Sequence, residues 1–412
     1  MRSSRAEASL AATRSRTSST RVTTPPSPTR PPPPTDHPPR SRSSLVTARI
    51  FWFLPTAGDG RSIVGASHAS ANIVEPAGFR RPSLRYLTEV AQAADRLGYE
   101  GVLTPTGTWC EDAWLTTAAL LQSTRRLKFL VAFRPGLTPP TLAAQQAATL
   151  QRFSEGRVLF NIVTGGDDVE QRRFGDWIDH DRRYARTDEF LGLVHRIWTE
   201  TSVDHEGEFF KVADARVSEA PDPLPEFWFG GSSDPALAVA AKHVQTYLTW
   251  GEPPADARAK IEKVQALADA EGRKLTYGIR LHTISRDTSE EAWAVAQKLL
   301  DELPEEQVSA AHALHSSSQS EGQRRMAALH GGSKDSLEIY PNLWAGVGLV
   351  RGGAGTALVG SHEEVANLIG EYHDAGFDEF ILSGYPHLEE SYHFAEGVRP
   401  ILDARGITVP AR

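Results

Sequence analysis

The sequence has little cysteine and no long apolar segment. Cys110 is the single cysteine among 412 residues, which excludes an intrachain disulfide, a cysteine-rich zinc site and an iron–sulfur cluster. No segment approaches the roughly 18–20 consecutive apolar residues that a transmembrane helix needs, which argues against a membrane protein. With 40% hydrophobic and 23% charged residues, the composition is that of a globular protein, and the cysteine content predicts a reducing, cytoplasmic compartment.

Three signature motifs of common enzymes are also absent. No Gly-x-Gly-x-x-Gly follows a predicted strand, so a dinucleotide-binding fold is not indicated. Gly-x-Ser-x-Gly is missing, so an α/β-hydrolase is not supported. The segment HLEESYH (387–393) lacks both the His-Glu-x-x-His order of zinc enzymes and a third ligand. We therefore expect no metal site.

Residues 1–48 differ from the rest of the chain in composition. They contain eight arginines against Glu7 and Asp36, nine of the 27 prolines and no aromatic residue. Such a segment cannot bury enough apolar area to offset the entropy of ordering it, so we predict a disordered head. The head carries a formal charge of +6, which leaves −14 on residues 49–412. An acidic body argues against nucleic-acid binding, which requires a basic face.

From Arg49 onward, short apolar segments alternate with stretches of helical periodicity. The apolar segments are dense in Val, Ile, Leu and Phe, as in strands buried on both faces. We expect these strands at 48–55, 99–105, 127–135, 157–165, 226–231, 245–252, 276–285 and 379–384. We expect helices at 83–97, 111–125, 139–153, 183–199, 234–243, 255–271, 288–300, 362–375 and 388–403. This alternation predicts a (β/α)8 TIM barrel with insertions over residues 49–412.

Three segments exceed what a minimal barrel needs. They are a long first loop at 56–82, a hairpin-like stretch at 203–218 and a large insertion at 301–360. The centre of the last one, residues 346–360, is glycine-rich, and we predict a mobile loop there rather than a helix or strand. Long loops in compact domains are usually functional or disordered.

In a TIM barrel the chemistry gathers where the strands end. The polar residues at the predicted strand ends are Cys110, Arg134, Asn161, Thr164, Ser233, Trp250, Arg280, His282 and Tyr385. A pocket with these side chains has cations, hydroxyl groups and an aromatic wall but few carboxylates, which favours an anionic ligand. Arg280 and His282 are two residues apart, so they point to the same side of their strand. The alternatives are a surface position for this pair and a buried, unreactive Cys110.

Several long strings resemble the FMN-dependent alkanesulfonate monooxygenases of the bacterial-luciferase-like flavin superfamily. The most specific are NLWAGVGLVRGGAGTALVG (342–360) and LSGYPHLEE (382–390); FGGSSD (229–234), YLTWGEPP (247–254) and GIRLH (278–282) add to them. The resemblance runs from about Arg49 to the C-terminus. It implies a luciferase-like barrel that uses reduced FMN and O₂ to cleave an alkanesulfonate into an aldehyde and sulfite.

The resemblance also implies partners and roles for residues. An NAD(P)H-dependent FMN reductase would deliver the reduced flavin, and the chain would form a dimer or tetramer. Arg280 and His282 resemble the pair that holds the sulfonate and moves protons, and Arg351 resembles the arginine of a mobile lid loop. Tyr385 resembles the active-site tyrosine, Trp250 a pocket wall and Cys110 a cysteine near the flavin. The implied FMN contacts are Thr106, Asn161, Thr164, Arg183, Tyr184 and Ser233.

The first two loops depart from the family pattern. Ala57 stands where the family has a histidine, the following segment to residue 82 is longer, and Thr108-Trp109 replaces a more polar pair. These changes leave the substrate open. The alternatives are a bulkier sulfonate such as a sulfonated sugar, a deazaflavin-dependent oxidoreductase on the same barrel, and a non-catalytic flavin-binding barrel.

Overall fold

A computed structural model describes residues 47–63 and 78–409 of the chain. Nearly all of the predicted head, residues 1–48, lies outside the described residues, as does much of the altered first loop. At the edge of the head, Ala48 already pairs with Thr408 through a β-bridge. No helix in the described part of the chain is long and apolar enough to cross a membrane.

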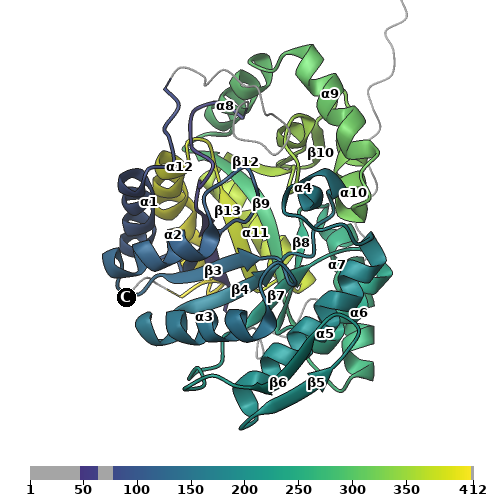
Figure 1. The fold of residues 1–412 in the computed structure, drawn as a ribbon. Coiled ribbons are helices and arrows are strands. Elements are labelled where there is room, and N and C mark those ends of the chain that lie inside the picture. The colour runs from purple at the N-terminus through teal and green to yellow at the C-terminus, as the bar shows by residue number, and fades with distance from the viewer. Residues whose placement is uncertain (1–46, 64–77, 410–412) are drawn as a thin grey trace, which may run out of the picture. The chain divides into compact units, whose positions relative to one another are not determined.

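Eight parallel strands close into a barrel, which confirms the predicted fold (Figure 1). Their order is β9-β13-β1-β2-β3-β4-β7-β8, and β8 also pairs with β9 to complete the ring. The strands are β1 (Arg49–Phe53), β2 (Gly101–Thr104), β3 (Lys128–Phe133), β4 (Val158–Ile162), β7 (Phe227–Gly230), β8 (Thr246–Trp250), β9 (Thr276–Arg286) and β13 (Glu379–Ser383). Each lies within a predicted strand segment or differs from it by one residue.

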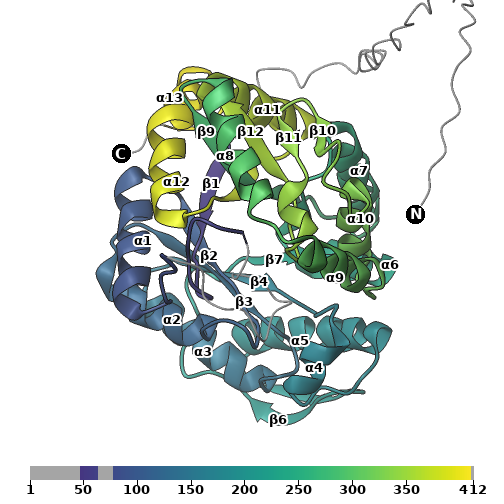
Figure 2. The ribbon, with the colours of Figure 1, turned by 90° about the horizontal axis from the view of Figure 1, so that it is seen from above.

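Helices surround these strands, with α1, α12 and α13 on one side and α6 and α7 on the opposite side (Figure 2). They are α1 (Leu84–Leu97), α2 (Ala113–Leu120), α3 (Pro140–Phe153), α5 (His180–Thr199), α6 (Asp234–His243), α7 (Pro254–Ala270), α8 (Ser289–Asp301), α11 (His362–Ala375), α12 (His387–His393) and α13 (Arg399–Ala404). Between α2 and β3 lies the 3₁₀ helix η2 (Leu121–Ser123), and the π-helix η4 (Phe394–Val398) joins α12 to α13.

Local sequence signals explain where these helices begin and end. Ser361 caps α11 and forms a capping box with Glu364, which satisfies two amide groups at the helix start. Gly376 ends the helix at a φ of 115°, a left-handed conformation that glycine adopts without steric cost. Ser83 and Gly98 bound α1 in the same way, with a serine cap at the start and a left-handed glycine at the end.

The described residues form three clusters of buried apolar side chains. One of them packs α8 on β12 (Ala357–Ser361) and includes Tyr385. The largest cluster lies between the strands and the surrounding helices and includes Trp52, Phe160 and Tyr247. A smaller cluster consists of the oppositely directed side chains of seven strands, namely Phe51, Phe53, Leu103, Leu130, Leu159, Trp228, Leu248 and Ile381. These side chains fill the barrel interior, so we expect a ligand site beyond the strand ends.

The insertions differ in how well the sequence predicts them. The predicted hairpin at 203–218 is confirmed by β5 (Val203–Glu206) and β6 (Lys211–Ala215), which pair antiparallel. The short helix α4 (Asp168–Arg173) was not predicted from the sequence. The large insertion contains α9 (Glu305–Ser316) and α10 (Glu321–His330).

The prediction that residues 346–360 form neither a helix nor a strand is wrong. This segment contains the 3₁₀ helix η3 (Gly346–Leu349) and the strand β12 (Ala357–Ser361), and most of its side chains are buried. The reason is the length of β9, whose last residues continue beyond the barrel and pair with β12 in parallel. The strands β10 (Glu338–Tyr340) and β11 (Leu343–Trp344) extend the same sheet. A neighbouring strand thus supplies hydrogen-bond partners that glycine content alone does not reveal.

Candidate active site at the carboxyl ends of the strands

A cavity of about 230 Å³ opens at the ends of β4, β7 and β8 and is covered by the start of α10. This volume is many times the roughly 10–15 Å³ that one water molecule requires. Of the predicted site residues, the lining includes Asn161, Thr164, Tyr184, Ser233, Trp250 and Arg280. Among the described residues that line the cavity, Glu321 is the one carboxylate. This agrees with the expected scarcity of acids.

Arg280 and His282 are joined through a serine that the sequence did not single out. Ser383 Oγ accepts a hydrogen bond from Arg280 Nη2 at 2.8 Å and lies 2.8 Å from His282 Nδ1. Because the serine accepts from the guanidinium, its own hydroxyl is free to donate to the imidazole. His282 Nε2 then carries the ring proton and donates it to the Ala354 carbonyl at 3.1 Å. The two predicted residues therefore lie in one buried chain of hydrogen bonds.

His282 is held in its neutral form. Burial, followed by the charges of Arg280 and Arg351, lowers its pKa well below 6.5. The resemblance implies that the pair of Arg280 and His282 moves protons. These surroundings do not favour that role for His282, because a ring with so low a pKa stays uncharged near neutral pH.

Arg351 and Tyr385 also meet, although the glycine-rich segment is far from Tyr385 in the sequence. Arg351 Nη1 donates to the Tyr385 hydroxyl, and the Tyr385 ring lies parallel to His282 at a centroid distance of 5.5 Å. The guanidinium groups of Arg280 and Arg351 lie over the Phe53 ring, 4.8 and 5.8 Å from its centroid. Such cation–π contacts partly compensate for the lost water.

The two guanidinium groups are buried cations without a bound carboxylate. Within residues 47–63 and 78–409, no ion pair to Asp or Glu is formed by Arg280 or Arg351. Burial and the neighbouring Arg351 lower the pKa of Arg280, and burial lowers the pKa of Arg351 to about 10. A buried charge of this kind is costly unless something pairs with it. The site therefore has an electrostatic preference for an anion.

Asp59 and His387 form a buried pair that the sequence analysis missed. Asp59 Oδ1 accepts from His387 Nδ1 at 2.8 Å, and Asp59 Oδ2 accepts from the His387 amide and the Tyr86 hydroxyl. Burial opposes the charged carboxylate, but the charge and hydrogen bond of His387 and the bonds from Tyr86 and Gly60 keep its pKa below the usual value. Both residues follow the ends of barrel strands, so their position was the signal that could have identified them.

The cavity has a second, more neutral end at the start of α6. Ser233 precedes this ten-residue helix without capping it, and its buried Oγ lies near the Tyr184 hydroxyl. The first amide groups of a helix attract anions, and phosphate groups bind at such positions. Ser232 and the glycines Gly230 and Gly231 line the same part of the cavity. Hydroxyl groups, free helix amides and small residues are the donor set that a phosphate requires, so the residues present fit FMN.

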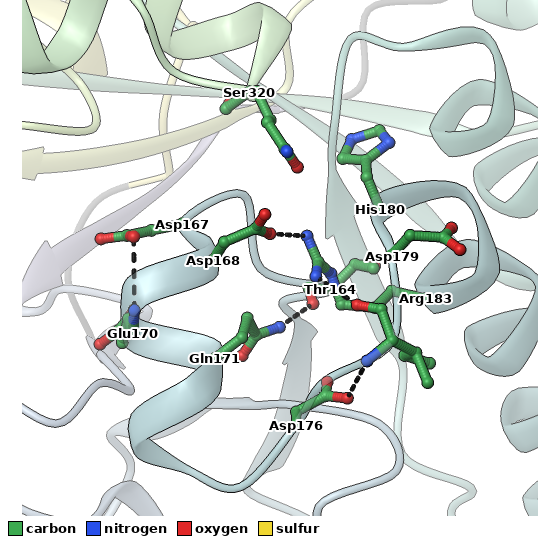
Figure 3. A network of polar contacts seen from close by, with 12 residues as sticks. Thr164, Asp167, Asp168, Glu170, Gln171, Asp176, Asp179, His180, Arg183 and Ser320 are labelled. Carbon is green, nitrogen blue, oxygen red and sulfur yellow. Dashed lines mark hydrogen bonds and ion pairs between the residues drawn. The ribbon is translucent and has the colours of Figure 1, made fainter.

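Seven predicted residues are not part of the cavity lining, namely Arg134, His282, Arg351, Tyr385, Arg183, Cys110 and Thr106. Arg183 is buried and binds Asp168 and the Ile178 carbonyl, both at distances below 3 Å, so it fixes α4 against α5 (Figure 3). Cys110 donates to the carbonyls of Pro105 and Gly107, and burial raises the pKa of its thiol to about 12. A thiol with this pKa is a poor nucleophile at neutral pH. Thr106 lies on the loop after β2, outside the lining.

The rim of the cavity near α4 is a polar network. Gln171 of α4 donates to the Thr164 carbonyl at 2.8 Å and accepts from Arg134 at 2.9 Å (Figure 3). Arg134, a predicted strand-end residue, also forms a buried ion pair with Glu170. Within the described part of the chain, no group of three His, Cys, Asp or Glu side chains is arranged to hold a metal ion.

The chain is similar to one known protein family and to several solved structures. Residues 48–379 match the family model described as luciferase-like monooxygenase. A structure of riboflavin lyase RcaE with modified FMN and riboflavin is 23% identical, with a TM-score of 0.73 over 88% of this chain and 93% of that one. EDTA monooxygenase EmoA from Chelativorans sp. BNC1 is 20% identical, with a TM-score of 0.68 over 89% and 96%. Long-chain alkane monooxygenase LadA is 19% identical, with a TM-score of 0.70 over 90% and 94%.

Proposed function

The chain belongs to the luciferase-like monooxygenase family, and on this premise we propose that it is a two-component, FMN-dependent monooxygenase that desulfonates an organosulfonate. In the simplest case an alkanesulfonate is converted to an aldehyde and sulfite. The observation that carries this proposal is the pair of buried guanidinium groups, Arg280 and Arg351, without a bound carboxylate. A sulfonate is a permanent anion, and fixed arginines suit it better than groups that titrate near neutral pH.

The cofactor proposal rests on the neutral end of the cavity. Ser232, Ser233 and the start of α6 would hold the FMN phosphate, while Asn161 and Tyr184 would contact the rest of the cofactor. Reduced FMN, when bound, would supply two electrons so that one oxygen atom of O₂ enters the product and the other leaves as water. The name of the RcaE structure, which includes modified FMN, supports a flavin on this type of barrel.

The partners are proposals of the same kind. A separate NAD(P)H-dependent FMN reductase would supply the reduced flavin, since the chain has no dinucleotide-binding motif of its own. We propose a homo-oligomer, a dimer or a tetramer, in keeping with the family resemblance.

The residues of the chain would bind the anion, exclude water and hold protons. Arg280 and Arg351 would bind the sulfonate oxygens, and the Tyr385 hydroxyl would be oriented by Arg351. His387 Nε2 is buried and has no hydrogen-bond partner among the described residues, whereas its Nδ1 is held by Asp59. This leaves Nε2 free to contact a bound substrate, while Asp59 fixes the orientation of the ring. The buried segment around Arg351 would keep water from the reacting groups.

A bulkier sulfonate is a second candidate for the substrate. It is favoured by Ala57, which replaces a histidine of the family pattern in the turn just before Asp59 and is partly exposed. Losing an imidazole there opens space on one side of the site while leaving the guanidinium groups in place. Names of structural neighbours such as EDTA monooxygenase and long-chain alkane monooxygenase support a barrel that accommodates different substrates.

Sulfite release tests this function. The full chain would be supplied with reduced FMN, O₂ and sulfonates from methanesulfonate to octanesulfonate, together with a sulfonated sugar. Sulfite from the linear compounds, strongly reduced but still measurable in Arg351→Ala, would support alkanesulfonate desulfonation, and sulfite from the sugar alone would support the bulkier substrate. Tight binding of reduced FMN without sulfite from any compound would overturn desulfonation. Turnover with a reduced deazaflavin but not with reduced FMN would overturn the FMN proposal and make the chain a deazaflavin-dependent oxidoreductase.

A further inference from the structure

The turn that carries Arg351 is held from two sides by different parts of the molecule. From the barrel, His282 Nε2 donates to the Ala354 carbonyl at 3.1 Å. From the large insertion, Gln323 Oε1 of α10 accepts from the Gly353 amide at 2.8 Å. Arg351 itself is buried, and its guanidinium group contacts Tyr385. Two hydrogen bonds therefore fix the backbone immediately after the arginine.

Gln323 is buried beside the turn. Its side chain is 8% exposed, so its amide oxygen has little access to water. A Cβ atom at Gly352 would lie 3.4 Å from both Gln323 Oε1 and His315 Nε2, so side chains of α10 and α9 both reach the turn. Gly353 has a φ of 86°, a conformation that residues with side chains adopt at a cost.

The helix that carries Gln323 is itself firmly attached. Ser320 caps α10 by accepting from the Gln323 amide. Arg325 donates to the buried Glu252 at 2.6 Å, which ties the same helix to the loop after β8. A Cβ atom at Gly166 would lie only 2.7 Å from Ser320 Cβ, so the start of α10 packs directly on the loop after β4. The helix is therefore a rigid support from which one side chain reaches the turn.

We propose that Gln323 is a positioning residue that holds the Gly352–Gly353 turn and thereby keeps the Arg351 guanidinium group against Tyr385. The glycines make the turn possible but also give it many conformations to lose, so it needs an external hydrogen bond to stay in one of them. The statement about position rests on the contacts alone. Its importance for catalysis rests on the proposed function.

Removing the acceptor should open the turn. In Gln323→Ala the half-buried Gly353 amide loses its partner, and such a loss shifts a local equilibrium about tenfold. In Gln323→Glu a carboxylate oxygen can accept the same hydrogen bond, so the turn should stay closed. Gln307→Ala is the matched control, because Gln307 is an exposed glutamine on α9 of the same insertion. Gln323→Met, which has similar volume and no acceptor of this strength, replaces Gln323→Ala if that variant does not fold.

Two measurements report on the turn without any activity. The first is hydrogen exchange of peptides that contain the Gly353 amide, and the second is the rate of trypsin cleavage after Arg351, detected by the mass of the fragment that begins at Gly352. We expect both to increase about tenfold in Gln323→Ala and to match the wild type in Gln323→Glu and Gln307→Ala. Unchanged exchange and cleavage in a folded Gln323→Ala would overturn the proposal.

A double-mutant cycle links the turn to catalysis and separates the two proposals. If Gln323 acts through Arg351, Gln323→Ala should lower kcat/KM for the sulfonate about tenfold in the wild type and have no further effect in Arg351→Ala. Additive losses would overturn the positioning role. If the wild type releases no sulfite, the proposed function fails, while the exchange and cleavage results still decide whether Gln323 holds the turn.

Discussion

At the scale of single residues, the site is a balance of buried charges. Two arginines and one aspartate lie beyond the strand ends, and the neutral His282 adds no charge to them. Among the described residues, the charge of Asp59 raises the pKa of Arg351 and partly offsets the effect of burial. The aspartate is in turn bound by His387, Tyr86 and the Gly60 amide. Such a cluster is sensitive to the loss of any one member, because a buried charge left without its partner is costly.

Replacing Asp59 should therefore destabilise the protein. In Asp59→Asn the side chain keeps an acceptor but loses its charge, and we expect the free energy of unfolding to fall by about 3 kcal/mol at pH 7. Urea denaturation of the full chain measures this loss. Asp374→Asn, an exposed aspartate on α11, is the control and should leave the midpoint unchanged.

The pH dependence of this effect has a definite sign. The pKa of Asp59 is lower in the folded protein than its usual value of 3.8. Its contribution to stability is thus complete above about pH 4 and is lost as the pH falls through the folded pKa. The difference between wild type and Asp59→Asn should shrink in acid. A difference that grows on acidification would contradict this assignment.

His330 gives a second pH-dependent prediction. It lies in α10 beside His312 and His315 of α9, and burial followed by these two histidines lowers its pKa to about 4. Between pH 6.5 and 4 the unfolded chain binds a proton that the folded protein excludes, so stability falls as the pH decreases through this range. His330→Asn keeps an acceptor for the Gly332 amide but does not titrate.

We expect His330→Asn to lose about 1 kcal/mol less stability than the wild type between pH 7 and pH 5. Urea denaturation at the two pH values measures this difference. His195→Asn, an exposed histidine on α5, is the control and should follow the wild type. Parallel curves for His330→Asn and the wild type would show that His330 titrates normally.

At the scale of elements, the barrel is regular and its insertions are attached through close contacts. The strand β9 is 11 residues long, and its extension supports β12 next to the segment with Arg351. On the other side of the cavity, α10 packs on the loop after β4 through Gly166. Glycines thus have two different roles here. Some allow close packing between elements, and others occur inside helices where they only add flexibility.

Two glycine substitutions should separate these roles. In Gly370→Ala, within α11, the new Cβ would lie 3.6 Å from Ile407 Cδ1, an ordinary contact, so we expect stability to increase by about 0.5–1 kcal/mol. In Gly166→Ala the new Cβ would lie 2.7 Å from Ser320 Cβ, so we expect a decrease of about 1–3 kcal/mol. Urea denaturation measures both, and a change of the same sign in the two variants would contradict the packing described.

At the scale of the whole molecule, composition separates residues 1–48 from the barrel. The barrel begins with pairs that involve its last residues, since the Ala48 amide donates to the Ile407 carbonyl at 2.7 Å. Arg49 also forms an ion pair with Glu379 at 2.6 Å. The chain before these residues carries the positive charge, while the remainder is strongly acidic. We propose that the head contributes nothing to the stability of the barrel.

Deletion of residues 1–46 tests this proposal. Because the deletion leaves Ala48 and Arg49 in place, we expect the Tm to stay within about 1 °C of the full chain. Differential scanning calorimetry of the two proteins measures it. Deletion of residues 1–50 is the positive control, because it removes part of β1 and should lower the Tm by several degrees. A Tm drop in the shorter deletion would indicate contacts between head and barrel.

The sequence alone determined the barrel and half of its site. The alternation of strands and helices was readable because each element is encoded by the spacing of its own consecutive side chains. The positions of Arg280, His282, Trp250 and Tyr385 at strand ends followed from the same alternation and from the rule that chemistry gathers there. The family resemblance added Arg351, which local pattern would have left in a loop.

The tertiary structure decided which distant residues meet. Asp59 and His387 are 328 residues apart, Gln323 and Gly353 belong to elements with no common periodicity, and β12 became a strand through the extension of β9. Arg183 lies outside the cavity lining because it binds Asp168 of α4, a contact that only the tertiary structure reveals. Local periodicity records which face of an element is buried. Only the closure of the barrel and the packing of its insertions determine what that face contacts.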